Sequence, residues 1–217
     1  MSFEKPDGKW LLLGLKGGAK CINEQTREVV SNWSGSDEFA SLRSTRWDHD
    51  SRLAALLYWN KLVILDPFSG SVKASCALGV QLHNLTWSPD GRFIAVGCHN
   101  GRWVILDANS LQEIAWFSGH QGPVLGLDWS TNGRIASASS DGTVRVWDNA
   151  TGDELLAFPH PDGRRFSTVR WTHDGRRLAA GDDQGRIFIW GFDDIQARPP
   201  GATGLASGII ARGAASR

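Results

Sequence analysis

Asp128-Trp129-Ser130-Thr131-Asn132-Gly133-Arg134-Ile135-Ala136 is the stretch that decides the fold, because its pattern recurs along the chain. Each copy has a tryptophan, then a polar turn centred on Asp or Asn, and then a short apolar run. The tryptophans of this pattern are Trp47, Trp87, Trp129 and Trp171, at spacings of 40, 42 and 42 residues. A fixed period of this length is typical of proteins that repeat one supersecondary unit.

A second landmark keeps the same period. An acidic residue closes a later strand of each unit at Glu24, Asp66, Asp107 and Asp148, spaced 42, 41 and 41 residues, and position 191 continues the series at 43. Two independent landmarks with one period indicate five repeats. Their predicted bounds are approximately 1–40, 41–80, 81–121, 122–163 and 164–191. A tail rich in Gly, Ala and Pro follows at 192–217, and we expect it to be mostly irregular.

Each repeat is predicted to contain four short strands, which we name a to d. In the third repeat these are residues 82–87, 93–98, 103–107 and 113–117, short apolar or alternating runs between Gly-rich breaks. Asp90-Gly91 and Asn132-Gly133 predict two-residue hairpins in which both central residues have positive φ. No segment has a helical period. An all-β chain of repeated four-stranded units of about 42 residues is typical of a β-propeller.

A family resemblance rests on the fourth repeat. Ser118-Gly119-His120, then Val124 to Trp129, then Ile135 to Asp148 with its Trp147-Asp148 end, together resemble a near-complete WD repeat. The Trp190-Gly191 pair resembles a degraded version of that end. The resemblance covers residues 3–191 and implies a WD40 β-propeller of five four-stranded blades that serves as a non-catalytic interaction platform. Within the family, residues 93–107 are similar to echinoderm microtubule-associated-protein-like propellers, which indicates a class of partner.

The resemblance also assigns roles to a set of polar residues. It implies that His120, Ser137 (or Ser139), Asp141 and Trp147 form a structural hydrogen-bonded tetrad, although His, Ser and Asp also suggest a nucleophilic triad. The sequence has no G-x-S-x-G elbow, so we favour the structural role. The fifth repeat keeps His160, Asp183 and Trp190 but has Ala179 and Gly181 in place of the serines. Its tetrad is therefore expected to be incomplete.

A candidate partner-binding site lies at the turns between strands b and c. Trp59 occupies such a turn beside Tyr58, and an aromatic pair at a turn tip predicts an exposed patch. The alternative is that Trp59 folds back over the neighbouring blade. Arg43, Arg164 and Arg165 map to d–a loops at the same rim, and His83 and His99 map near it. Arginine with aromatic residues is the usual composition of a binding hot spot, so we expect a partner to dock on this rim.

Composition and short motifs argue against several classes of function. The chain of 217 residues has 23 Lys+Arg and 23 Asp+Glu, and zero net charge argues against binding nucleic acid by bulk charge. The six histidines have no ligand spacing and the three cysteines form no CxxC, so we expect neither metal nor cofactor. No apolar run approaches the ~18 residues of a membrane helix. The N-terminus has no signal-peptide core. We therefore expect a cytoplasmic protein, with the nucleus left open.

Three functions remain in competition on the sequence alone. The favoured one is a non-catalytic scaffold or adaptor that binds a protein or peptide within a multiprotein complex. The second is a WD-repeat subunit associated with microtubules or nucleic acid, and the third is a hydrolase built on a propeller.

The sequence also leaves open how the ring of blades closes. Residues 205–211 could return as the missing d strand, further blades could belong to a longer protein, or a second chain could complete the ring. We expect five blades in an arc or a loosely closed ring, with residues from about 192 onward mostly irregular.

Overall fold

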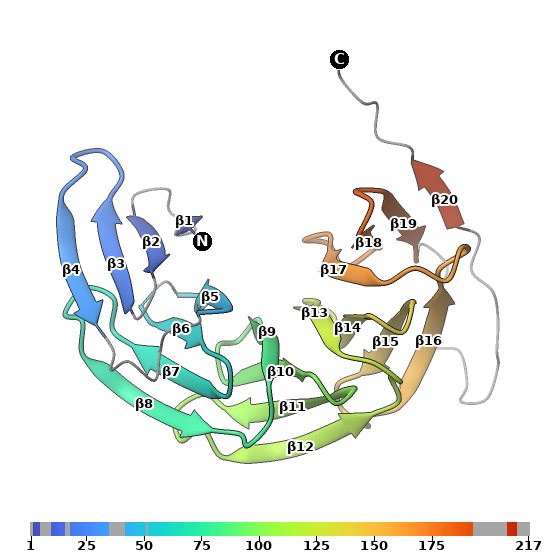
Figure 1. Ribbon diagram of the computed structural model, residues 1–217, viewed down its shortest axis with the longest axis horizontal. Coiled ribbons are helices and arrows are strands. Elements are labelled where there is room, and N and C mark those ends of the chain that lie inside the picture. Colours follow the sequence, from blue (N-terminus) through green and yellow to red (C-terminus); the bar gives the residue numbers. More distant parts are fainter. Residues whose placement is uncertain are drawn as a thin grey trace. The chain divides into compact units, whose positions relative to one another are not determined.

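Twenty strands form five separate four-stranded sheets in the computed structural model, and the residues it describes contain no helix. The structure describes residues 2–4, 10–15, 18–34, 42–50, 52–192 and 208–211. Within each sheet the strands lie side by side in chain order (Figure 1). The all-β class and the five four-stranded units predicted from the sequence are confirmed. The chain divides into two compact units, Met1–His99 with Trp103–Trp116, and Asn100–Arg102 with Phe117–Arg217.

The first unit holds the first three sheets. The first sheet consists of β1 (Ser2–Glu4), β2 (Trp10–Leu15), β3 (Gly18–Asn23) and β4 (Val29–Ser34). The second sheet consists of β5 (Ser44–Trp47), β6 (Ala54–Leu57), β7 (Lys61–Leu65) and β8 (Val72–Ala77). The third sheet consists of β9 (Leu82–Trp87), β10 (Phe93–Cys98), β11 (Arg102–Asp107) and β12 (Glu113–Ser118), and a few of its terminal residues belong to the second unit.

The second unit holds the last two sheets. The fourth sheet consists of β13 (Val124–Trp129), β14 (Arg134–Ser139), β15 (Thr143–Asp148) and β16 (Glu154–Pro159). The fifth sheet consists of β17 (Phe166–Trp171), β18 (Arg177–Asp182), β19 (Ile187–Gly191) and β20 (Gly208–Ala211). Strands β13 and β17, the first of each sheet, contact one another.

Both faces of the second sheet are buried, which explains the unbroken apolar runs of its central strands. Successive residues of a strand point to opposite faces. Leu56 therefore packs in a core with Leu12 of the first sheet, whereas Leu57 packs in another core with Val96 of the third sheet. The second unit has an equivalent core between its two sheets, which includes Val146 and Phe166.

The recurring tryptophans end the first strand of their sheets and are buried. Trp87, for example, is 8% exposed, and its indole Nε1 donates to the backbone oxygen of Arg46 in the preceding sheet at 3.4 Å. The indole thus fills the space between consecutive sheets while its polar edge bonds to the neighbour. The tryptophan period in the sequence reflects the repeated burial of an indole at the end of the first strand of a sheet, whereas the indole hydrogen bond is not repeated at Trp171 within the described residues.

The acidic landmark holds the turn between the third and fourth strands. The Oδ1 atoms of Asp66, Asp107 and Asp148 each accept hydrogen bonds from the backbone N–H groups two and three residues later, at 2.7–3.2 Å. In the first repeat Asn23 takes this role, bonding to the N–H groups of Gln25 and Thr26, so the assignment of Glu24 is wrong by one residue. The short Asn side chain reaches these donors in the same way as Asp.

The turns at Asp90-Gly91 and Asn132-Gly133 differ from the predicted two-residue hairpins. Only the glycines have positive φ, 69° for Gly91 and 81° for Gly133. The Gly91 N–H bonds to the Ser88 oxygen, and the Asp90 carboxylate accepts from the Ser88 hydroxyl and the Arg92 N–H. The connection is therefore a longer loop with a single glycine in the left-handed region.

The tail contributes one strand. Gly208–Ala211 forms β20, which pairs antiparallel with β19 and supplies the fourth strand of the fifth sheet. This pairing matches the alternative in which part of residues 205–211 returns as the missing fourth strand, while the expectation that the tail is mostly irregular stays a prediction. Pairing with β19 satisfies backbone groups that would otherwise form an open edge. Residues 193–207 and 212–217 lie outside the described part of the chain.

Candidate functional site

Four of the predicted binding residues come together in the first unit. Arg43 precedes β5, Trp59 lies in the turn between β6 and β7, His83 lies on β9, and His99 follows β10. We call these four residues the aromatic–basic patch. The Leu82 N–H donates to the Trp59 oxygen at 2.7 Å and the His99 N–H to the Gln81 oxygen at 2.8 Å. These bonds hold the two turns against the start of β9.

Arg43 and Trp59 form the aromatic half of the patch. The Arg43 Cζ atom lies 4.6 Å from the centroid of the Trp59 ring, within the range of a cation–π contact. Trp59 is 48% exposed, so its side chain is not packed away from solvent. Arg43 Nε is shielded from solvent and has no hydrogen-bond partner among the described residues. The Arg43 N–H bonds to the Leu57 oxygen at 2.7 Å, which anchors the backbone below the guanidinium.

His83 and His99 form the other half of the patch. His83 Nε2 lies 3.0 Å from His99 Nδ1, so one ring donates to the other. Burial lowers the pKa of His83, and the neighbouring His99 and Arg43 lower it further. His83 is therefore neutral at pH 7 and can take part in this bond. The sequence placed both histidines near one rim but carried no signal for the bond between them, since it joins residues 16 positions apart.

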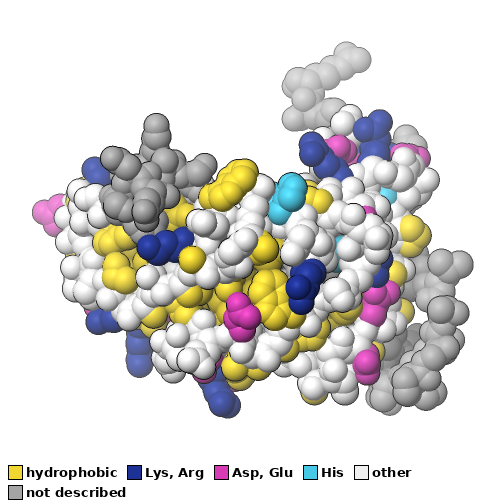
Figure 2. Space-filling view, turned by 60° about the horizontal axis from the view of Figure 1, so that its bottom comes forward, with side chains coloured by type: hydrophobic (Ala, Val, Ile, Leu, Met, Phe, Trp, Pro, Cys, Tyr) yellow, Lys and Arg dark blue, Asp and Glu magenta, His cyan; other side chains and the backbone are white. Residues whose placement is uncertain are grey.

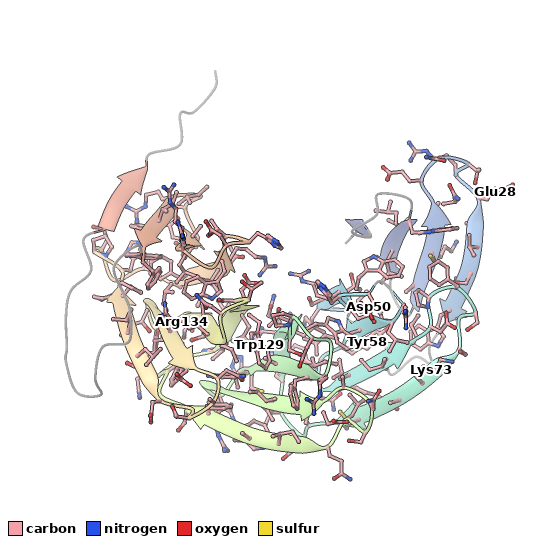
Figure 3. All side chains as sticks on the ribbon, turned by 180° about the vertical axis from the view of Figure 1, so that it is seen from behind. Glu28, Asp50, Tyr58, Lys73, Trp129 and Arg134 are labelled. Carbon is pink, nitrogen blue, oxygen red and sulfur yellow. The ribbon has the colours of Figure 1, made fainter. Side chains whose placement is uncertain are left out.

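Tyr58 does not join Trp59 at the surface. It is 1% exposed, and its ring lies 6.2 Å from that of Trp33. Figure 3 shows its side chain among the strands of the second sheet, whereas Lys73 on β8 lies at the outer side of that sheet. Burial raises the pKa of the Tyr58 hydroxyl. The predicted exposed aromatic pair is thus wrong for Tyr58, because adjacent residues at the end of β6 point in opposite directions.

Arg164 and Arg165 belong to the second unit. Arg165 Nε lies 3.1 Å from Asp183 Oδ2, and the arginine side chain is 58% exposed. An exposed pair of this kind contributes little to stability. The proposal that these arginines share one binding rim with Trp59 stays a prediction.

The structure joins the four predicted tetrad residues of the fourth repeat. His120 Nδ1 lies 2.8 Å from Asp141 Oδ2, and His120 Nε2 lies 2.7 Å from Ser137 Oγ. Trp147 Nε1 donates to the same Ser137 oxygen at 2.8 Å. Of the two candidate serines, Ser137 belongs to the tetrad, whereas the Ser139 hydroxyl donates to the Gly122 oxygen.

Thr143 is a further member of this network, and it was not predicted from the sequence. Its hydroxyl donates to Asp141 Oδ1 at 2.7 Å, and the Gln121 N–H donates to Asp141 Oδ2. Burial alone would raise the pKa of Asp141, but these bonds and His120 lower it to about 2. Burial lowers the pKa of His120 and outweighs the opposite effect of Asp141. The sequence could have indicated this role, because Thr143 follows Asp141 by two residues in Asp141-Gly142-Thr143.

Ser137 is not placed to act as a nucleophile. It is fully buried, and its oxygen accepts the Trp147 N–H while its own proton faces His120. A nucleophile needs a free lone pair and an approach for substrate. The network instead joins the loop before β13, strand β14, the turn that follows it and strand β15. A buried network whose members are all hydrogen-bonded stabilises such a junction.

The fifth repeat uses a different acid from the predicted one. His160 Nε2 lies 3.2 Å from Asp182 Oδ2, whereas Asp183 pairs with Arg165, so the assignment of Asp183 is wrong by one residue. Arg186 donates to Asp182 at 2.6 Å and to Asp162 at 2.7 Å. The assignment of Ala179 and Gly181 to the serine positions is also wrong by one residue, because the strand register places Ala180 where Ser137 lies and Asp182 where Ser139 lies. Without a serine at position 180, the histidine turns to a carboxylate on the strand itself. Trp190 stacks on Phe158 with centroids 4.7 Å apart.

Both ring nitrogens of His160 have partners in this network. The Asp162 N–H donates to His160 Nδ1 at 3.0 Å, while Nε2 lies near both Asp182 Oδ2 and, at 3.1 Å, Arg186 Nη2. Burial alone would raise the pKa of Asp182, but hydrogen bonds from the Arg186 side chain and from backbone N–H groups lower it strongly. The network is therefore a carboxylate held by a guanidinium and an imidazole.

Other site types find no support in the described ranges. They contain no cluster of three or more His, Cys, Asp or Glu side chains that could hold a metal ion. Within them no disulfide joins Cys21, Cys76 and Cys98, and two of these three thiols are buried. Over the same ranges no helix is long and apolar enough to cross a membrane. Figure 2 shows basic and acidic side chains interspersed on the face it presents, with hydrophobic side chains between them.

Known proteins resemble this chain in its repeats. The human serine-threonine kinase receptor-associated protein is 30% identical over 123 residues, which cover 56% of this chain and 35% of that protein. The B-type cell cycle switch protein ccs52A of Medicago truncatula is 27% identical over 152 residues, 69% of this chain and 32% of that protein. The periodic tryptophan protein 2 homolog of Dictyostelium discoideum is 30% identical over 114 residues, 51% of this chain and 12% of that protein.

The chain thus spans about a third of the length of the first of these relatives. The family model for the WD domain, G-beta repeat, matches residues 74–107, 111–148 and 153–191, together just over half of the chain. These matches fall on the third to fifth sheets and on the end of the second, and they confirm the WD resemblance seen in the sequence. The five sheets are WD-type blades, and this chain belongs to the WD40 family.

Proposed function

We propose that this chain is a non-catalytic scaffold that binds a partner protein or peptide through the aromatic–basic patch. The observation that carries the proposal is the exposed indole of Trp59 with Arg43 stacked on it. Tryptophan and arginine are the residue types that most often dominate binding energy at protein interfaces. Because main-chain bonds fix both turns of the patch, little conformational entropy is lost on binding.

The tetrad supports the non-catalytic part of the proposal. Its serine is buried and its oxygen already carries two hydrogen bonds, so it serves stability. The name of the human relative describes association with a receptor, which fits a binding role for this chain. WD40 proteins in general are interaction scaffolds, and the patch is our candidate for where this one binds.

The proposal is tested by comparing what three immobilised forms of the chain retain from an extract of the source cells. The forms are the unaltered chain, Trp59→Ala and Ile114→Ala. Ile114 is a matched control, since it is 58% exposed but lies on the outer strand β12. We expect at least one protein to be retained by the unaltered chain and by Ile114→Ala and to be lost with Trp59→Ala. Retention of the same proteins by all three forms, with unchanged circular dichroism, would exclude the patch.

A further inference from the structure

Among the described residues, Arg43 has no counter-charge, in contrast to four arginines of the second unit. Four arginines of the second unit each lie within 4.0 Å of a carboxylate, in the pairs Arg145–Glu154, Arg165–Asp183, Arg170–Asp128 and Arg186–Asp162. Arg43 has no such partner among the described residues, and its neighbours are the Trp59 ring and His83. The described part of the first unit therefore presents a cation that it does not itself neutralise.

The environment of this cation favours an anionic partner. Arg43 Nε is shielded from solvent and lacks a hydrogen bond within the described ranges, so part of the guanidinium is poorly hydrated. An incoming anion would be screened less here than at a fully solvated side chain. The planar guanidinium also matches a carboxylate, which can accept two parallel hydrogen bonds from it. Stacking on Trp59 fixes the plane in which those bonds are offered.

The histidine pair adds one hydrogen-bond donor to the patch. Each imidazole ring carries at least one N–H group, and one N–H is used between His83 Nε2 and His99 Nδ1. The second N–H then lies on an outer nitrogen, either His99 Nε2 or His83 Nδ1. Neither outer nitrogen has a partner among the described residues. The patch thus offers a cation, one N–H donor and an exposed indole.

We infer that the aromatic–basic patch binds an acidic segment of the partner protein, with a carboxylate on Arg43 and a neighbouring apolar side chain on Trp59. This inference rests on the proposed function and specifies its partner chemistry. The charge is the recognised feature, because the described residues leave Arg43 without a carboxylate of its own. The indole contributes apolar contact area beside it, as in binding hot spots generally.

The test is selection of displayed random octapeptides on the full chain, followed by affinity measurements on the enriched sequences. We expect enrichment of Asp or Glu next to an apolar residue. Replacing the enriched acids by Asn or Gln, or Arg43 by Gln, is expected to weaken binding about tenfold or more, as for loss of a charged hydrogen bond. Arg170→Gln is the matched control and is expected to change binding less than about twofold, because Asp128 already neutralises that arginine.

Charge reversal sharpens this test. Arg43→Glu is expected to select peptides that carry Lys or Arg in place of the acids, provided that its melting temperature matches that of the unaltered chain. If Arg43→Glu does not fold, the inference is tested by Arg43→Gln and by the peptides in which Asn or Gln replaces the enriched acids. No enrichment of acidic residues, or acidic peptides whose affinity does not depend on Arg43, would overturn the inference.

The two proposals can fail separately. If Trp59→Ala loses natural partners while Arg43→Gln keeps them, the patch is a binding site but its partner is not recognised by charge. If Trp59→Ala retains every partner, the proposed function itself fails.

Discussion

The fourth and fifth repeats place a histidine at the same position and satisfy it in different ways. His120 lies between Asp141 and Ser137, and Trp147 completes a chain of hydrogen bonds that includes a single charged group. His160 instead faces Asp182, a carboxylate that also binds Arg186. Both arrangements bury the histidine, at 6% and 5% exposure. The two repeats therefore share burial of the ring, while the bonding around it changes.

The difference follows from three side chains. The fourth repeat has Ser137 opposite the histidine, and the fifth has Ala180 at the equivalent position of the strand. The fifth has Asp182 where the fourth has Ser139, so its carboxylate lies two residues earlier than that of Asp141 does in the fourth. Arg186 then neutralises this buried charge. A buried polar network has to be fully satisfied, and each repeat meets that requirement with the groups it has.

The largest effect is expected when the buried carboxylate of the fifth repeat is removed. Asp182→Ala leaves Arg186 Nε, the His160 N–H and two backbone N–H groups without their acceptor. We expect the free energy of unfolding to fall by about 3 kcal/mol in urea titrations. Asp183→Ala is the matched control, with an expected change within about 0.5 kcal/mol, because its ion pair is largely exposed. Equal losses for the two variants would contradict the assignment of Asp182.

Loss of the fourth-repeat histidine is expected to cost less. His120→Ala leaves Asp141 Oδ2 with fewer donors and removes the acceptor of the Ser137 hydroxyl. Each unsatisfied buried group costs about 1–3 kcal/mol, and we expect a loss in this range. His173→Ala, in an exposed turn, is the control and should leave the melting temperature unchanged. A His120→Ala variant of full stability that loses an enzymatic activity would support the hydrolase alternative instead.

Acid is expected to weaken the fourth repeat through His120. Burial holds the pKa of folded His120 below the ordinary 6.5, despite Asp141 and Glu154, while Arg145 acts in the same direction as burial. Below pH 6.5 the unfolded chain therefore binds a proton that the folded chain does not. The stabilising contribution is present above that ordinary pKa and is lost as the pH falls towards the folded pKa, by at most about 1.4 kcal/mol per pH unit.

The variant His120→Asn isolates this effect from the other histidines, such as His83. Urea titrations at about pH 7.5 and about pH 5.5, on either side of the ordinary histidine pKa, should show a smaller acid loss for the variant than for the unaltered chain. Equal losses in both would mean that His120 is protonated as readily in the folded as in the unfolded chain. The Asp141 carboxyl contributes only at lower pH, between its ordinary pKa of 3.8 and about 2.

The repeat pattern predicted the strands almost to the residue. In the third repeat the predicted runs 82–87, 93–98, 103–107 and 113–117 became β9 to β12, with a difference of one residue at the start of β11 and at the end of β12. The prediction succeeded because the landmark tryptophans and aspartates have the same structural role in successive repeats. Each buried indole lies at the end of the first strand, and each aspartate closes a turn through bonds within three residues.

Apart from the hairpin turns, the errors described below are shifts of a single residue or of a single face. Spacing could not distinguish Asp182 from Asp183, or Asn23 from Glu24, because a loop one residue longer or shorter absorbs the difference. The side of the sheet on which Tyr58 lies depends on where β6 ends, which the sequence leaves open by one residue. The contact of Arg43 with Trp59 joins two different loops, and no local pattern encodes it.

The smallest effect tests whether the two repeats can be interconverted. Ala180→Ser places a hydroxyl where Ser137 lies in the fourth repeat, but His160 Nε2 already faces Asp182 and Trp190 stacks on Phe158. Ala180 is buried, so the added hydroxyl lacks a partner, and we expect the free energy of unfolding to fall by about 1 kcal/mol. The same substitution made together with Asp182→Ser, which copies Ser139, frees the ring to turn to the new hydroxyl. There we expect the added Ala180→Ser change to recover about 1 kcal/mol relative to Asp182→Ser alone. Recovery in the double variant and a loss in the single variant would show that Asp182 holds the fifth repeat in its own arrangement, whereas a gain of about 1 kcal/mol from Ala180→Ser alone would show that the missing serine is the whole difference.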